Sequence, residues 1–177
     1  MHAPCPLALV LGALSTTCSG ALAKGDGRAF GDDLGRFHVA AHMSSSTCGP
    51  GAVDAPGQWE FDVVLSHLSD HLYWNTGADA VEGTLAADGK TFTMTSETVV
   101  NVGGAAATAA TCAVVREDNA SGELDDPKQP RHFTGTLEYA FAAQGRSDCS
   151  SLLLEGGFAT LPCRMAYQLS ATWASAR

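Results

Sequence analysis

The sequence predicts an all-β protein whose single domain is an antiparallel, up-and-down β-barrel of about eight strands. Apolar and polar residues alternate with a period of two along most of the chain, which is typical of strands with one face on a core. Asp88-Gly89 stands between two such runs, as in a tight hairpin, and no segment has a convincing helical period. A β-sandwich is the alternative architecture. We favour the barrel because the long final run can pair with the first and so remove free sheet edges.

The first two strands are expected on either side of a loop that is rich in glycine and proline. Apolar residues alternate with polar or small ones over residues 36–44, and residues 59–66 repeat the pattern. The prolines and glycines of residues 48–57 favour a loop between these runs. A short third strand is expected at 71–75.

The Asp88-Gly89 dipeptide joins two alternating runs, residues 81–86 and 91–97, into the clearest hairpin of the sequence. With these two residues in the loop, the apolar positions of both strands fall on one face, so the turn and the hydrophobic pattern specify the same register. The resulting cross-strand pairs are Leu85 with Phe92 and Gly83 with Met94. A glycine on the apolar face leaves room for its large neighbour and permits the sheet to bend. The segments ASGEL and FTGTL place Gly122 and Gly135 in the same setting.

The second half of the chain contains three further predicted strands and one helical turn. Residues 112–117 form a short strand, and residues 133–141 and 163–173 are the two cleanest alternating runs. Valines at 99–102 extend the preceding strand, whereas the alanines and glycines that follow favour a loop. The long connection before the last strand contains a helical turn at Ser150–Glu155.

The amino-terminal residues predict export. Residues 1–23 form a signal peptide, with an apolar run at 7–14 and small residues at the end. Residues 24–35 then form a flexible segment, and the barrel domain occupies residues 36–177. The expected location is therefore periplasmic or extracellular. Lipid attachment at Cys18 is the alternative, although Ser15 occupies the position at which lipidation favours an aliphatic residue.

The formal net charge of −9 argues against partners that carry many phosphates. An acidic surface repels nucleic acids and anionic lipid headgroups. After residue 23, no apolar run has the length of a membrane-spanning segment. We therefore expect neither nucleic-acid binding nor a transmembrane segment.

Four cysteines remain after removal of the signal peptide, and an even number in an exported chain predicts two disulfides. Of the three pairings, we expect Cys149–Cys163, because these residues bracket a short connection between two strands. The second disulfide is then Cys48–Cys112. A zinc site is disfavoured because no two cysteines have the short spacing of a zinc-binding pair.

The sequence contains no recognised catalytic or metal-binding motif, and we expect no cofactor and no catalytic residues. It lacks both the G-x-S-x-G and the H-E-x-x-H patterns. His38 and His42 share a strand face but stand about 13 Å apart, which is too far for one ion. We expect these and the other histidines to be solvent-exposed. The sequence leaves open whether the protein is an enzyme, and an enzyme with an unfamiliar site is the least favoured functional class.

The alternating strands, the VEGTL run before Asp88-Gly89 and the closing GGFATLPCRMAYQLSATW resemble small exported bacterial β-proteins of uncharacterised function. The architecture is similar to lipocalin- and calycin-like barrels, although the G-x-W of true lipocalins is absent near the first strand. The resemblance implies an interior that holds one small apolar ligand. The candidate ligand-binding residues are the aromatic side chains on the apolar strand faces: Trp59, Phe61, Phe133, Tyr139, Phe141 and Tyr167. The same side chains would fill a solid core.

Two functional classes follow from these expectations. The first is a binding module for a small apolar ligand. The second is a disulfide-stabilised envelope or extracellular domain that binds a protein partner and has no ligand cavity. Whether the barrel interior is hollow distinguishes the two.

Overall fold

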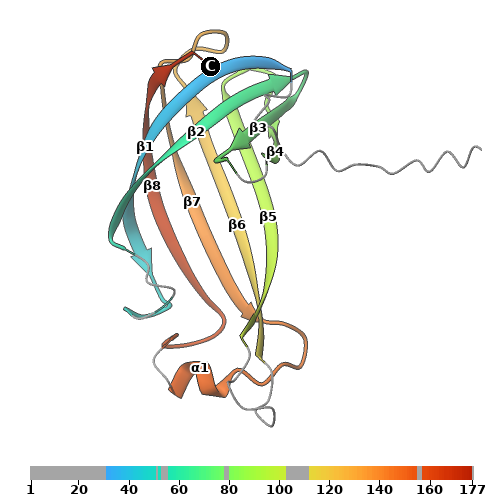
Figure 1. Cartoon of the computed structure of the whole chain (residues 1–177), viewed down its shortest axis with the longest axis vertical. Helices are drawn as coiled ribbons and strands as arrows, with labels where there is room; N and C mark the ends of the chain where they lie inside the picture. Colours follow the sequence, from blue (N-terminus) through green and yellow to red (C-terminus); the bar gives the residue numbers. More distant parts are fainter. Residues whose placement is uncertain are drawn as a thin grey trace, which may run out of the picture.

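The computed structural model describes residues 31–50, 52, 56–77, 80–102, 112–154 and 157–176. Within them, eight antiparallel strands and one short helix form a closed barrel (Figure 1). Each strand pairs with its neighbours in sequence, and the last pairs with the first, so the predicted up-and-down barrel is confirmed over the sandwich. The elements are β1 (Asp32–Ser46), β2 (Gln58–Leu68), β3 (His71–Asn75), β4 (Ala80–Leu85), β5 (Thr91–Val102), β6 (Cys112–Leu124), β7 (His132–Ala143), α1 (Ser150–Leu154) and β8 (Cys163–Ser175).

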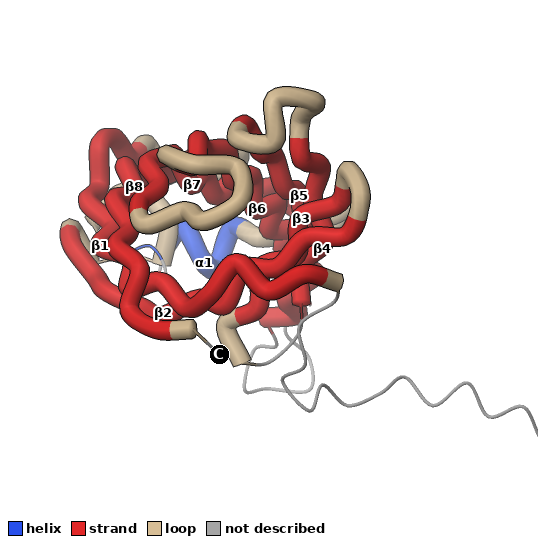
Figure 2. The backbone as a smooth tube through the Cα atoms, turned by 90° about the horizontal axis from the view of Figure 1, so that it is seen from above, coloured by secondary structure: helices blue, strands red, loops and turns tan. Residues whose placement is uncertain are grey.

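The two ends of the barrel differ. The upper end in Figure 1 carries the short β2–β3 and β4–β5 turns and the β6–β7 loop. The lower end carries the β1–β2 loop and the long β7–β8 connection with α1. Seen from above, α1 lies at the far end of the ring of strands (Figure 2). The expected signal peptide and Cys18 fall outside the described residues.

Two strands are longer than their sequence patterns predict. β1 begins at Asp32 rather than at residue 36, because a bulge between Asp33 and Gly35 lets the strand continue. There the Asp33 carboxylate accepts a hydrogen bond from the Gly35 N–H at 2.8 Å. β6 extends to Leu124 rather than to residue 117, because its polar residues pair with both β5 and β7.

The upper half of the barrel has a filled core. Phe133 is 1% exposed and lies at the centre of an aromatic cluster. Its ring centroid is 5.5 Å from that of Phe37 and 5.8 Å from those of Trp74 and Phe92. Edge-to-face and tilted contacts at these distances are the favoured aromatic geometries, so this cluster contributes both apolar burial and a fixed shape.

The predicted β4–β5 register is confirmed: Leu85 pairs with Phe92, and Gly83 pairs with Met94. A Cβ atom added to Gly83 would collide with the Met94 side chain and the Thr93 carbonyl oxygen. A Cβ atom added to Gly122, which pairs with Phe92, would lie 2.5 Å from the Phe92 ring. These glycines therefore permit the close approach of large inward side chains.

In the described residues, the backbone pairing of β3 and β4 is confined to the upper half of the barrel because both strands are short. β3 pairs only with residues 64–68 of β2, and β4 pairs only with residues 92–94 of β5. Among the described residues, the lower part of β2 therefore pairs with β1 alone, and the lower part of β5 pairs with β6 alone. This interruption in the pairing lies opposite the inner faces of β7 and β8.

Both disulfides lie at the lower end, and the predicted pairing is wrong. The structure contains Cys48–Cys163 and Cys112–Cys149, with Cα–Cα distances of 5.0 and 4.8 Å. Barrel closure explains the first, because the Thr47 N–H donates to the Arg164 carbonyl and so continues the β1–β8 ladder as far as these cysteines. The second forms because β6 and β7 are neighbours and residue 149 follows the end of β7 closely.

The disulfides fix the connection between β7 and β8 across the lower end. This connection contains α1, whose position confirms the predicted helical turn over residues 150–154. Phe158 is 8% exposed and packs against Phe141 at 5.3 Å. The Ala159 N–H donates to the Cys48 carbonyl at 2.7 Å, so the segment is held by backbone bonding as well as by its two cysteines.

We expect Gly83→Val to lower the free energy of unfolding by about 1–3 kcal/mol, because the added methyl groups crowd Met94 and the β5 backbone. The measurement is urea denaturation. Gly57→Val is the matched control, since nothing lies within 4 Å of a Cβ atom at Gly57. Equal stability of the two variants would contradict this role of Gly83.

Non-reducing peptide mapping should recover Cys48–Cys163 and Cys112–Cys149 as the two linked pairs. Their sequence separations are 115 and 37 residues. In the loop-entropy model, removal of the first pair therefore costs about 1 kcal/mol more than removal of the second. Denaturation of the two double Cys→Ala variants measures the difference. A linked Cys149–Cys163 peptide would overturn the assignment.

Candidate functional site

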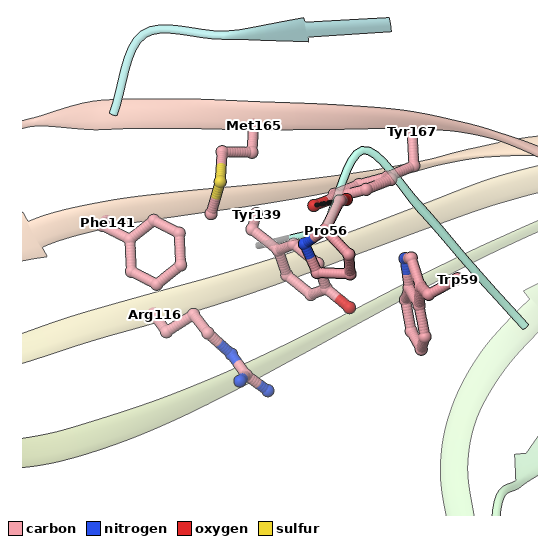
Figure 3. Close-up of a pocket in the computed structure, with 7 residues that line it drawn as sticks. All are labelled: Pro56, Trp59, Arg116, Tyr139, Phe141, Met165 and Tyr167. Atoms are coloured by element: carbon pink, nitrogen blue, oxygen red, sulfur yellow. Dashed lines mark hydrogen bonds between the residues drawn. The ribbon is translucent and has the colours of Figure 1, made fainter. Parts of the chain in front are cut away.

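A cavity of about 240 Å³ lies in the lower half of the barrel, below the aromatic cluster (Figure 3). Its walls come from the inner faces of β2, β6, β7 and β8 and from the end of the β1–β2 loop. The lining residues are Pro56, Trp59, Arg116, Tyr139, Phe141, Met165 and Tyr167.

Alternation along the strands turns these side chains inward. Tyr139 and Phe141 lie two residues apart on β7, and Met165 and Tyr167 stand in the same relation on β8. Tyr139 pairs with Met165 across the two strands, so all four side chains share one face of the sheet. Trp59 approaches from β2, on the far side of the cavity.

The aromatic rings of the cavity contact one another edge to face. The Tyr167 centroid is 6.2 Å from that of Trp59 and 5.9 Å from that of Tyr139. Phe61 stacks on Trp59 at 4.5 Å and supports it. Trp59 and Tyr139 are only partly buried, so their rings form a surface that a ligand can reach.

Four of the six predicted ligand-binding residues line this cavity: Trp59, Tyr139, Phe141 and Tyr167. The other two do not. Phe133 belongs to the filled upper cluster, and Phe61 lies beside Trp59 without lining the cavity. The alternation of apolar and polar residues shows on which face of the sheet a side chain lies. It does not show the height of that side chain along the barrel axis, and Phe133 differs from the lining residues in its height.

Three lining residues were not among the predicted ones, namely Pro56, Met165 and Arg116, and Arg116 is the charged one. Its partner across the strands is the inward-facing Phe141, so the guanidinium group is on the inside of the barrel. Asp118, two residues further along β6, faces the same way opposite Tyr139. The sequence does contain a signal for this inward placement. Arg116 and Asp118 follow the buried Val114 at steps of two residues, so all three side chains lie on the same face of the strand.

Arg116 and Asp118 form a bidentate ion pair on the cavity wall. The Arg116 Nε donates to Asp118 Oδ1 and Nη2 donates to Oδ2, both at 2.7 Å. The Arg116 side chain is 39% exposed and that of Asp118 is 18% exposed. The guanidinium carbon also lies 5.3 Å from the centre of the Tyr139 ring, which adds a cation–π contact.

The tyrosines of the cavity are held in their neutral form. Burial, aided by the nearby Asp118 carboxylate, raises the pKa of Tyr139 to about 12. Burial also raises the pKa of Tyr167, whose hydroxyl donates to the Pro56 carbonyl at 3.4 Å. The site therefore offers neutral hydroxyl groups, a guanidinium group and aromatic faces, which together suit binding rather than nucleophilic chemistry.

The histidines lie elsewhere. His38 is on the outer surface, where its Nδ1 is 2.9 Å from Asp62 Oδ1 and its Nε2 is 3.4 Å from Glu60 Oε2. The hydrogen bond to Asp62 raises the pKa of His38. Within the part of the chain that the structure describes, no three His, Cys, Asp or Glu side chains converge in a way that could hold a metal ion. No helix in the described part of the chain has the length and apolar character needed to span a membrane, since α1 has five residues.

We expect Tyr139 to make the folded protein sensitive to alkaline pH. Its pKa is raised from 10.0 in the free side chain to about 12 in the fold, so its contribution to stability is complete below about pH 10 and is lost as the pH rises towards 12. Urea denaturation across this range should show a smaller loss for Tyr139→Phe than for the unsubstituted protein. Identical pH dependence in both proteins would contradict the buried, neutral phenol.

Comparison with known proteins found no match to a family model, a curated protein or a solved structure. A barrel fold alone does not define a function, because one fold can carry many unrelated sites. The chemistry of the cavity is therefore the guide to function.

Proposed function

We propose that this protein is an exported binding module for a small ligand with a flat, apolar body. The observation that carries the proposal is the aromatic cavity in the lower half of a barrel whose upper half is filled. On this side of the cavity the short β3 and β4 strands leave the lower parts of β2 and β5 without a shared neighbouring strand among the described residues.

The lining suits a planar ligand. Three electron-rich rings, those of Trp59, Tyr139 and Tyr167, surround the cavity, and aromatic faces bind flat apolar groups by stacking or by edge contacts. Sites for drug-sized ligands have volumes of about 300–1,000 Å³. A cavity of about 240 Å³ therefore favours a smaller molecule, with one or two rings.

Export is supported by the two disulfides, which persist in oxidising compartments such as the periplasm or the extracellular space. The predicted signal peptide over residues 1–23 and the net charge of −9 agree with such a location. The alternative function is a protein-interaction domain without a ligand cavity. The partly exposed aromatic rings favour ligand binding over this alternative, and we propose no enzymatic activity.

Calorimetric titration with 2-methylnaphthalene, a two-ring apolar probe, tests the proposal. We expect saturable binding to one site. Trp59→Leu should weaken binding at least about fivefold through loss of the aromatic contact. Trp173→Leu is the matched control, because Trp173 lies at the upper end of the barrel with Arg131 over its ring at 4.1 Å. Its binding is measured by calorimetry alongside that of Trp59→Leu. Absence of saturable binding, or equal weakening in both variants, would overturn the proposal.

A further inference from the structure

We infer that Arg116 makes the cavity selective for a carboxylate, so that the ligand class is a one- or two-ring apolar molecule carrying a single carboxylate group. The inference rests on the proposed ligand-binding function. It is carried by the placement of a guanidinium group, already oriented by Asp118, at the surface of an aromatic cavity.

The guanidinium group retains a free bidentate face. The guanidinium group of arginine has five N–H donors. They form two faces that can each bind a carboxylate: one made by Nε and Nη2, and one made by the terminal nitrogens Nη1 and Nη2. Asp118 occupies the Nε side, through Nε and one N–H of Nη2. Among the described residues, no acceptor is bound to Nη1. The terminal face can therefore receive a second carboxylate in the same two-bond geometry that the first one uses.

Asp118 acts as a positioning residue. Its two 2.7 Å hydrogen bonds and the Tyr139 ring fix the plane of the guanidinium group, so a ligand need not immobilise a flexible arginine on binding. Asp118 itself is not among the residues that line the cavity. The guanidinium group thus separates a bound carboxylate from the Asp118 carboxylate.

The free donors of Arg116 favour an anion at short range. Arg116 is the one residue with a formal charge among the seven described residues that line the cavity, and its pair with Asp118 is neutral overall, so the attraction comes from the unused N–H groups of its terminal face. A carboxylate placed there gains charge-assisted hydrogen bonds, whereas a neutral amide makes weaker ones. The protein's net charge of −9 opposes the approach of an anion, but salt screens that long-range repulsion beyond about 8 Å. The contact with Arg116 is not screened in this way.

The apolar body of the ligand then has one place to lie. In Figure 3 the Arg116 guanidinium and the Tyr139 hydroxyl both point towards the lower part of the view, into which the Trp59 indole also extends. A carboxylate on the guanidinium would direct the attached ring towards Trp59 and Tyr167, whose centroids are 6.2 Å apart. Charge and apolar surface are therefore arranged for one amphipathic molecule.

The test compares three probes with the same ring system: 2-naphthoate, 2-naphthamide and 2-methylnaphthalene. Calorimetric titration of the folded protein at neutral pH should show 2-naphthoate binding at least about tenfold more tightly than 2-naphthamide. In the double variant Arg116→Gln/Asp118→Asn, which leaves no unpaired charge in the wall, this preference should disappear while 2-methylnaphthalene still binds.

The matched control is Arg164→Gln/Glu138→Gln. This pair lies on the exposed outer face of β7 and β8, with Arg164 Nη1 and Glu138 Oε1 2.9 Å apart, and its removal changes the charges equally. The control should keep the full preference for 2-naphthoate. Equal affinity for 2-naphthoate and 2-naphthamide, with 2-methylnaphthalene still bound, would overturn the carboxylate inference alone. Failure of all three probes to bind would overturn the proposed function as well.

Discussion

The backbone ladder between β1 and β8 is the interaction on which the other features of this protein depend. It joins the two strands that are most distant in sequence and so removes the edges that an open eight-stranded sheet would expose. It also brings Cys48 beside Cys163 and turns the apolar faces of all the strands towards a common interior. Without this closure, neither the aromatic cluster nor the cavity below it would have an opposite wall.

The interior is divided because the strands differ in length. At the upper end all the strands contribute, and three large aromatic side chains surround Phe133, with Gly122 making room for Phe92. Lower down, β3 and β4 have ended, so fewer side chains reach the axis. A polar pair, Arg116 with Asp118, can stand on an inner wall there because each group satisfies the other. The short third and fourth strands thus convert a solid core into a partly open site.

Local pattern predicted much of this structure. The period of two located the strands, and the β4–β5 register followed from one dipeptide, because turn geometry and hydrophobic alternation are both short-range constraints. The disulfides could not be predicted from spacing alone, since Cys48–Cys163 depends on closure of the barrel and Cys112–Cys149 depends on the β6–β7 register. The expected pairing of the last strand with the first already implied Cys48 beside Cys163. Arg116 was missed because a charged residue in a strand normally faces water, and only its bond to Asp118 explains the exception.

The segment between Cys149 and Cys163 is held at both ends by covalent bonds to different walls, Cys112 on β6 and Cys48 after β1. Its position therefore depends less on the side chains between the cysteines than a free loop's position would, because the cross-links have already reduced the loop's conformational freedom. A replacement of similar length that keeps the core contacts of Leu152, Phe158 and Leu161 and the backbone bond of Ala159 should leave the ends of the segment in place. The lower end of the barrel is thus a natural place for grafting a foreign peptide onto this scaffold.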